Sequence, residues 1–275
     1  MKLTVLMDNH TEIDVYHLGE PAVSYWLEAD GKRFLFDTGY SDAFLKNAKA
    51  MGIDLTTADA ILLSHGHNDH TGGLPDLLAL PFSKKPRLIA HPHALLPKQW
   101  NGMDIGSPLS MKELQKKAVL EFTEEPLWLT DHLVFLGEIP HTVDFEPAYA
   151  IGETVLDGQT VPDIIDDDTA LAYVTDTGIY IITGCSHAGI CNIIQYAKAV
   201  TGKTKVLGLL GGLHLMEENK RSQETVDFLA KKQIPALYPC HCTAFPVRAA
   251  LHAVSPIQEV SVGMTLEWER SEERR

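Results

Sequence analysis

The feature that most constrains this chain is the stretch Ser64-His65-Gly66-His67-Asn68-Asp69-His70-Thr71-Gly72-Gly73. It places three imidazoles and one carboxylate within six positions, directly after the apolar run Ala60-Ile61-Leu62-Leu63. Each imidazole has two ring nitrogens that need partners when buried, so packing alone does not explain these side chains at the end of a buried strand. A histidine-rich turn exposed to water is the alternative. The density of ligand-type side chains before a glycine pair favours a divalent metal site.

The spacing within this loop predicts how one or two ions would be held. Because alternate residues of a loop can point the same way, we expect His65 and His67 to face one ion while Asp69 and His70 face a second. Aspartate supplies a hard oxygen and histidine a borderline nitrogen, a mixture that suits Zn²⁺, Mn²⁺ or Fe. We expect zinc first, with Mn or Fe as alternatives.

Composition limits the class of protein. The 275 residues are 45% hydrophobic, enough for a well-buried core, and no shift in composition divides them, so we expect a single domain over 1–275. The formal charge of −14 predicts a surface that repels nucleic acid and anionic membranes. The N-terminal apolar run meets Asp8 too soon for a signal peptide, and no run approaches the roughly 20 apolar residues of a membrane span. Four cysteines without a regular framework indicate thiols in a reducing compartment, so we expect a soluble cytoplasmic protein of undetermined oligomeric state.

The rest of the chain follows a pattern of strands and helices. Strands are expected at 2–7, 23–28, 32–36, 60–63, 87–90, 133–136, 169–175, 179–183, 205–210, 236–238 and 259–268. Helices are expected at 41–51, 74–80, 108–119, 190–200, 223–232 and 245–254. A charged tail at 269–275 is expected to lie in solvent.

Three late strands repeat the arrangement of the first loop, in which an apolar strand gives way to ligand-type residues. The residues that follow these strands are Cys185 with His187, then His214, then His241. Functional groups of open α/β sheets gather at strand ends, so we expect these side chains to converge on the histidine loop. His214 follows a glycine pair that lets the backbone approach a ligand closely, which makes it a candidate donor to substrate; a structural histidine is the alternative.

Residues 84–150 have a weaker pattern punctuated by prolines, and we expect them to form an insert that shapes a substrate pocket. Its histidines His91, His93 and His141 are candidate ligands, although plain loop histidines are the commoner reading. Before the histidine loop, Asp37 follows an apolar strand. We expect Asp37 to hold a ligand loop from behind the metal, although an acid that only accepts bonds within its own turn would have the same pattern.

Together these motifs resemble the metallo-β-lactamase superfamily. The resemblance rests on the loop at 64–73, on Phe36-Asp37-Thr38-Gly39 before it and on the late single histidines, and it covers nearly the whole chain. It implies an α/β fold (α+β by some schemes) built as a four-layered αββα sandwich, with one or two metal ions along one edge. The segments 35–39, 183–190, 211–215 and 241–243 resemble the branch often labelled dihydropterin-ribofuranosylaminobenzene-phosphate synthase.

The resemblance also implies a ligand set: His65 and His67 on the first metal, Asp69 and His70 on the second, and His241 as the last ligand. This chain departs from the pattern at two places. Many hydrolases of the superfamily have a histidine in a His-Thr-Pro-Gly stretch where this chain has Asp167-Asp168-Thr169-Ala170-Leu171. Many also bridge the ions with an aspartate where this chain has Gly184-Cys185-Ser186-His187. To complete the set we favour His187, then Asp168, then Cys185.

Metal-assisted hydrolysis of an ester-, phosphoester- or lactone-type small molecule is the function we expect. A metal ion lowers the pKa of bound water from about 15.7 to about 7, and a neighbouring ion polarises a carbonyl or phosphoryl oxygen. Asp69 would both ligate and orient the water, with His214 donating to substrate.

Two other functions are open. The first is group transfer of the kind the branch name implies, on a phosphorylated or pterin-like substrate. It should need an electropositive pocket and an aromatic wall, for which Trp100, Trp128 and Tyr173 are candidates. The second is a non-catalytic metal sensor that uses Cys240 and Cys242 as extra soft ligands.

Overall fold

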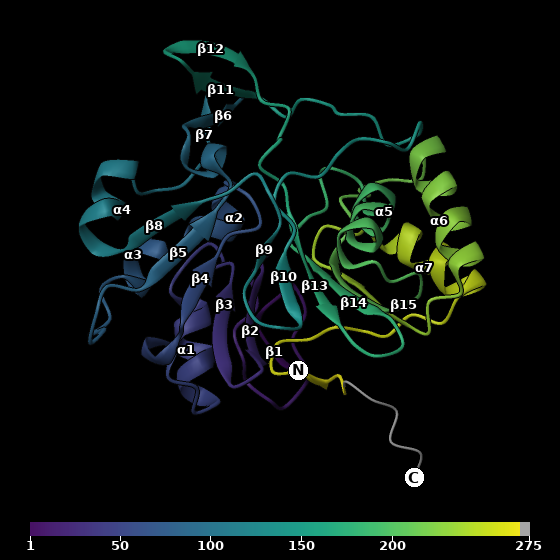
Figure 1. The fold of residues 1–275 in the computed structure, drawn as a ribbon, viewed down its shortest axis with the longest axis horizontal. Helices are drawn as coiled ribbons and strands as arrows, with labels where there is room; N and C mark the ends of the chain where they lie inside the picture. Colours follow the sequence, from purple (N-terminus) through teal and green to yellow (C-terminus); the bar gives the residue numbers. More distant parts are fainter. Residues whose placement is uncertain (270–275) are drawn as a thin grey trace.

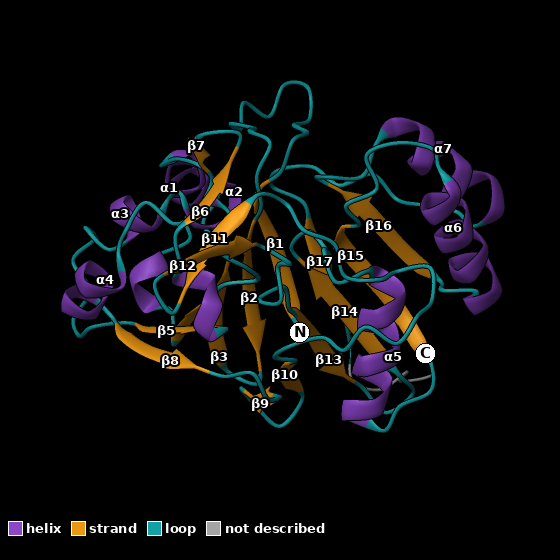
Figure 2. Ribbon diagram, turned by 90° about the horizontal axis from the view of Figure 1, so that it is seen from above, coloured by secondary structure: helices purple, strands orange, loops and turns teal. Residues whose placement is uncertain are grey.

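In a computed structural model, residues 1–269 of the chain are described. Two large sheets pack face to face and helices cover the outer face of each, as Figures 1 and 2 show. The predicted α/β fold with a four-layered αββα sandwich is confirmed. The charged tail predicted at 269–275 lies, apart from Glu269, outside the described residues.

The first sheet has seven strands in the order β17-β1-β2-β3-β4-β5-β8. They are β1 (Lys2–Met7), β2 (Ser24–Ala29), β3 (Lys32–Phe36), β4 (Ala60–Leu62), β5 (Arg87–Ala90), β8 (Val119–Phe122) and β17 (Thr265–Glu267). Asp30 and Gly31 join β2 to β3 with φ of 50° and 77°, the left-handed backbone that a two-residue hairpin needs. Because β3, β4 and β5 run parallel, their carboxyl ends open at the same edge.

The second sheet has six strands in the order β16-β15-β14-β13-β10-β9. They are β9 (Leu127–Trp128), β10 (Leu133–Phe135), β13 (Ala170–Val174), β14 (Ile179–Thr183), β15 (Val206–Gly212) and β16 (Ala236–Cys240). Strands β14, β15 and β16 are parallel, so the three late ligand segments leave the sheet at one edge.

Three apolar cores hold the four layers together. The helices that cover the first sheet are α1 (Ala43–Ala50), α3 (Leu74–Leu77) and α4 (Met111–Lys117), and those that cover the second are α5 (Ile190–Thr201), α6 (Lys220–Lys232) and α7 (Phe245–Val254). Short helical turns are η1 (Leu55–Thr57), α2 (Asn68–Thr71) and η2 (Pro92–Leu95). Buried residues such as Phe36 and Ile182 fill the space between the sheets. Within the described residues, no helix is long and apolar enough to cross a membrane.

A third, four-stranded sheet lies at one end of the sandwich and was not predicted. Its strands, in the order β12-β11-β6-β7, are β6 (Lys98–Trp100), β7 (Met103–Asp104), β11 (Glu153–Leu156) and β12 (Gln159–Pro162). Of the predicted insert at 84–150, β6 and β7 belong to this sheet, whereas β5, β8 and β10 belong to the two large sheets.

Three predicted elements are clearly shorter than expected, the first being the helix predicted at 74–80, because α3 ends at Leu77. The strand predicted at 259–268 is wrong in extent, because Gly263 has a φ of 93° that breaks the extended chain and leaves only β17. The helix predicted at 108–119 begins later, where a capping box between Ser110 and Glu113 satisfies the first backbone N–H groups.

Candidate metal centre

The histidine loop leaves β4 and turns directly into α2. His67 is the residue that caps α2, so Asp69 and His70 reach the centre from a helical turn rather than from an extended loop. His65 Nε2 lies 3.1 Å from His67 Nδ1, which keeps the first two imidazoles together. The tight course of the loop needs Gly66, since a Cβ there would lie 2.1 Å from the carbonyl oxygen of Ala94.

A second set of side chains meets on the other side of the loop. His70 Nε2 lies 3.1 Å from Cys185 Sγ and 3.4 Å from Asp69 Oδ2. His241 Nε2 lies 3.3 Å from the same Asp69 oxygen. The structure therefore brings Asp69, His70, Cys185 and His241 into one group whose ligand atoms all lie within 4.8 Å of one another.

Cys185 links this group to the first. Its thiol also lies within 4.8 Å of ligand atoms of His65 and His187, while His65, His67 and Asp69 form a further set at the same range. The imidazoles of His65 and His187 have ring centroids 4.7 Å apart. All of these residues thus form one continuous cluster with room for one or two ions.

The backbone at several strand ends adopts a strained left-handed conformation that orients the side chains of the centre. Asp37, Ser186, His214 and His241 have φ of 61°, 61°, 44° and 49°, although none is a glycine. They follow β3, β14, β15 and β16, the strands whose carboxyl ends carry the centre. Such conformations cost roughly 1–3 kcal/mol each and persist where the surrounding structure fixes them, as it does here.

The second ring nitrogens of four histidines have partners of their own. His70 Nδ1 donates to Asp37 Oδ2 at 2.7 Å, and His241 Nδ1 donates to Asn9 Oδ1 at 3.2 Å. His65 Nδ1 lies 2.9 Å from Ser64 Oγ, and His187 Nδ1 lies 3.3 Å from Tyr149 Oη. Asp37 thus bonds to the ring nitrogen of His70 opposite to the one that faces Cys185.

Three ring nitrogens of the cluster have no hydrogen bond to any residue that the structure describes. Nε2 of His67, His187 and His241 is buried and has no hydrogen-bond partner. Orphaned imidazole nitrogens are costly, and their presence in a cluster with one thiol and one carboxylate fits a divalent cation with mixed N, O and S ligands. The donor set therefore fits the metal that the sequence predicted.

The charge states of three imidazoles and one carboxylate agree with that fit. Burial lowers the pKa of His67 to about 4, and burial also lowers the pKa of His65 and His187 well below the usual value. These imidazoles are therefore neutral, the form that binds metal. Burial raises the pKa of Asp69, but His70 and His241 outweigh it and hold that pKa well below its usual range, so the carboxylate is ionised.

The acid pair after the third sheet supports both ligand loops. Asp167 Oδ2 accepts from the N–H of Gly66 at 2.6 Å, between the first two histidines. Asp168 Oδ2 accepts from the N–H of Ala188 at 3.0 Å, next to His187, and Asp168 lies in none of the groups above. Burial raises the pKa of Asp168 to about 8.

Of the other predicted candidates, all but Cys242 lie away from the cluster. His91 and His93 meet Asp166 in a separate group, and His141 Nδ1 donates to the carbonyl oxygen of Glu146 at 3.1 Å. Cys240 points into the core, 3.4 Å from Tyr25 Oη, whereas Cys242 lies within 4.8 Å of Cys185 and His214.

Sequence reasoning missed Asn9 and Tyr149. Asn9 follows β1 just as the other site residues follow their strands, so the same rule would have found it. Tyr149 stands in a loop without such a signal.

The cluster opens into a pocket of about 320 Å³. Its walls include Trp100, Ile105 and Met216 together with the candidate ligands His67, Asp69, Cys185, His187 and His241. His214 also lines it, with a buried Nδ1 that has no hydrogen-bond partner. The pocket brings an apolar wall and the ligand cluster within reach of one small molecule.

Asp37→Asn is expected to weaken metal binding by about 10- to 100-fold, because a neutral amide no longer fixes the His70 tautomer that leaves Nε2 free. Chelator competition on the purified variant measures the metal dissociation constant. The exposed Asp54, which accepts from Thr56 N within its own turn, supplies the matched control Asp54→Asn. Unchanged metal affinity in Asp37→Asn would show that Asp37 only stabilises its turn.

The chain belongs to the metallo-β-lactamase superfamily, whose family model matches residues 18–201. It is 30% identical to the 7,8-dihydropterin-6-methyl-4-(beta-D-ribofuranosyl)-aminobenzene-5'-phosphate synthase of Methanocaldococcus jannaschii, over 89% of this chain and 88% of that protein. It is 32% identical to protein MJ0448 of the same organism, over 88% and 91% of the two chains. The crystal structure of Tm1679, described as a metal-dependent hydrolase of the beta-lactamase superfamily, superposes with a TM-score of 0.82 at 27% identity and covers 98% of this chain and 99% of that one.

Proposed function

We propose that this protein is a metal-dependent hydrolase that acts on an ester-, phosphoester- or lactone-type small molecule. The observation that carries the proposal is the orphaned Nε2 of His67, His187 and His241 beside Asp69 and Cys185, at the wall of one 320 Å³ pocket. We propose zinc in a dinuclear centre held by His65, His67 and His187 on one side and Asp69, His70 and His241 on the other, with Cys185 between them. Asp168 is an alternative ligand, should one of these residues not bind the metal.

A bound divalent ion would supply Lewis-acid activation of water and of the substrate's carbonyl or phosphoryl oxygen. The chain's own groups would do the rest. The ionised Asp69 carboxylate can accept a hydrogen bond from water in the pocket and so orient it. His214, whose ring centroid lies 4.1 Å from that of His187, can donate to the substrate beside the cluster, and Trp100 and Ile105 give the pocket an apolar wall.

Group transfer is the second candidate, favoured by the synthase name of the relative from M. jannaschii. Trp100 supplies the aromatic wall that this reaction should need, whereas Trp128 and Tyr173 are not among the residues lining the pocket. No lysine or arginine is among the described residues that line it either. A phosphate there would depend on bound metal for positive charge, so we rank hydrolysis first.

Metal analysis with a substrate screen tests the proposal. Protein purified without added metal is expected to carry one to two zinc ions per chain and to cleave at least one member of a panel of phosphodiester, lactone and thioester compounds. Removing the metal with a chelator should abolish that activity and zinc should restore it. Turnover of a pterin with a ribosylated aromatic phosphate, without hydrolysis of the panel, would favour the transferase. Absence of metal binding on titration would remove both enzyme functions.

A further inference from the structure

A second pocket of about 830 Å³ borders the metal pocket, and nothing above has assigned it. Tyr40 and Asn68 line both pockets. Asn68 stands between the candidate ligands His67 and Asp69, so the two pockets meet directly beside the metal centre.

One segment of the chain also forms a common wall. Ile105 lines the metal pocket, while Asp104 and residues 106–111 line the second. The N–H of Asn68 donates to the carbonyl oxygen of Ile105 at 2.8 Å, and Asn68 Nδ2 donates to that of Asp104 at 3.5 Å. The wall is therefore fixed to α2, the helix that carries two candidate ligands.

The second pocket offers mainly apolar surface. Leu95, Leu96, Leu109 and Met111 contribute to its lining, and the only charged residues in the described lining are Lys98 and Asp104. Lys98 Nζ donates to Asp163 and Asp167 at 2.9 Å each, and Asp104 Oδ1 accepts from Gln99 Nε2 at 2.9 Å. Two carboxylates neutralise Lys98, and the Asp104 carboxylate would repel an anion, so an uncharged and mainly apolar group fits the largely apolar lining best.

The volumes of the two pockets also indicate that the second one holds a separate part of the substrate. The metal pocket is near the lower end of the roughly 300–1,000 Å³ typical of ligand sites and would hold little beyond a reacting group, whereas the second pocket is large enough for a further moiety. We propose that the substrate is elongated, with its reacting group at the metal and an uncharged, mainly apolar arm that crosses Tyr40 and Asn68 into the second pocket. This inference rests on the metal-dependent function proposed above.

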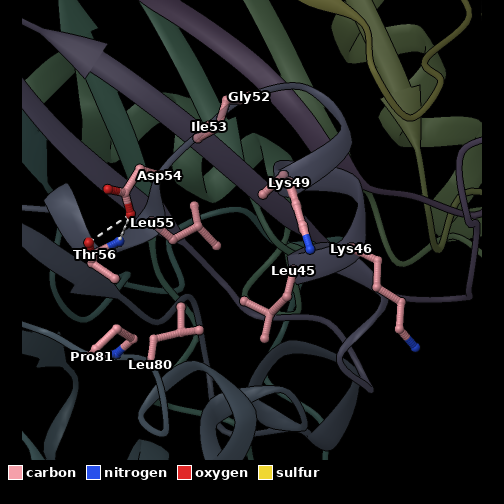
Figure 3. Close-up of a pocket in the computed structure, with 11 residues that line it drawn as sticks. Leu45, Lys46, Lys49, Gly52, Ile53, Asp54, Leu55, Thr56, Leu80 and Pro81 are labelled. Atoms are coloured by element: carbon pink, nitrogen blue, oxygen red, sulfur yellow. Dashed lines mark hydrogen bonds between the residues drawn. The ribbon is translucent and has the colours of Figure 1, made fainter.

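A third pocket provides the control. Figure 3 shows this site, about 590 Å³ between α1, η1 and the chain that follows α3, with Leu45, Leu55 and Leu80 in its wall. It shares no residue with the metal pocket. Leu80 and Leu109 are both half-buried and pack against the same apolar core, so trimming either one to alanine removes a similar amount of packing.

The test measures binding of two hydroxamic acids to zinc-loaded protein by titration calorimetry. Acetohydroxamic acid carries only a metal-binding head, and 6-phenylhexanohydroxamic acid adds an apolar arm. We expect the longer compound to bind at least about tenfold more tightly, because burial of as few as two methylenes suffices for that ratio. Leu109→Ala should reduce the ratio at least about threefold, Leu80→Ala should leave it unchanged, and Ser107→Phe, which places an aromatic ring in the second pocket, should also reduce it.

The outcomes separate the metal-dependent function from the role of the second pocket, here called the arm pocket, in binding the apolar arm. Equal binding of both compounds to the wild-type protein, or equal loss of the ratio in Leu80→Ala and Leu109→Ala, would overturn the arm pocket while the short compound still reports an intact metal centre. Failure of both compounds to bind zinc-loaded protein would overturn the metal-dependent function, and the arm pocket with it. Thermal unfolding of each variant confirms that folded proteins are compared.

Discussion

His67→Ala and Asp69→Ala are each expected to lower kcat/KM at least about a thousandfold while the protein stays folded. Nε2 of His67 is buried at the pocket wall without a hydrogen bond, so this nitrogen contributes nothing to folding that alanine would remove. Asp69 lies with one carboxylate oxygen 3.4 Å from His70 Nε2 and 3.3 Å from His241 Nε2, and it is the carboxylate that lines the pocket. Loss of either side chain removes a metal ligand, and loss of Asp69 also removes the group that orients water.

Steady-state kinetics on purified, zinc-reconstituted variants gives the measurement, together with bound zinc per chain and urea unfolding. His252→Ala is the matched control, because His252 is an exposed histidine of α7 that does not line the metal pocket. Its activity and zinc content should equal those of the wild type. If both His67→Ala and Asp69→Ala retained wild-type turnover, the hydrolytic site would have to lie elsewhere in the molecule.

Local signals explain why most of the sandwich could be predicted from the sequence. Strands such as β4 and β14 are short apolar runs followed closely by ligand-type residues. This pattern can be recognised in the sequence without knowing which strands lie next to them. The small third sheet has no such signal. The strands β11 and β12 are largely exposed, so the contrast between a buried and a solvent face that marks other strands is weak.

Side-chain direction after a strand was harder to predict than the strand itself. The sequence favoured His187, then Asp168, then Cys185 as the residue that completes the centre. In the structure, Ser186 adopts a φ of 61°, and the segment around it brings both Cys185 and His187 to the cluster. Asp168 instead faces the backbone of Ala188. A left-handed residue that is not glycine gives no clear signal in sequence, because tertiary contacts stabilise it.

Contacts between residues distant in sequence could not be predicted either, because they too depend on the tertiary structure. Asn9 and His241 are 232 positions apart, yet two hydrogen bonds join them, at 3.2 Å each. The contact exists only because β1 and β16 end near the same edge of the sandwich. Sequence reasoning could identify both as residues that follow strands, but not that one orients the other.

Lys98→Met is expected to lower the free energy of unfolding at neutral pH by about 3–5 kcal/mol. Only 2% of Lys98 is exposed, and its Nζ bonds to the buried carboxylates of Asp163 and Asp167. Methionine preserves most of the volume, so the loss comes from leaving two buried carboxylates without their cation. Equilibrium urea unfolding measures the difference.

The pH dependence of this difference follows from the direction of two pKa shifts. Burial lowers the pKa of Lys98, but Asp167 and Asp163 outweigh it and raise the pKa above its usual value. Its contribution is therefore complete below the unfolded pKa of about 10.4 and is lost as pH rises through the higher folded value. Burial raises the pKa of Asp167, but the effect of Lys98 is larger and lowers this pKa below its usual value. The stability that the Asp167 carboxylate contributes is therefore lost as pH falls below about 3.9 and through the folded pKa. The wild-type advantage should be constant from about pH 5 to pH 9 and shrink outside that window.

An exposed ion pair of similar length separates burial from charge. Lys46 Nζ lies 2.8 Å from Asp42, but 61% of the Lys46 side chain is exposed, and Lys46→Met should cost less than about 1 kcal/mol. Neutralising Asp163 and Asp167 to asparagine in the Lys98→Met background should recover most of the lost stability.

Because Asp167 also holds Gly66 between His65 and His67, Lys98→Met should bind zinc more weakly as well, and the triple variant should recover part of that affinity. A Lys98→Met protein as stable as wild type, with unaltered zinc affinity, would mean that the buried carboxylates neither depend on Lys98 nor transmit its position to the metal loop.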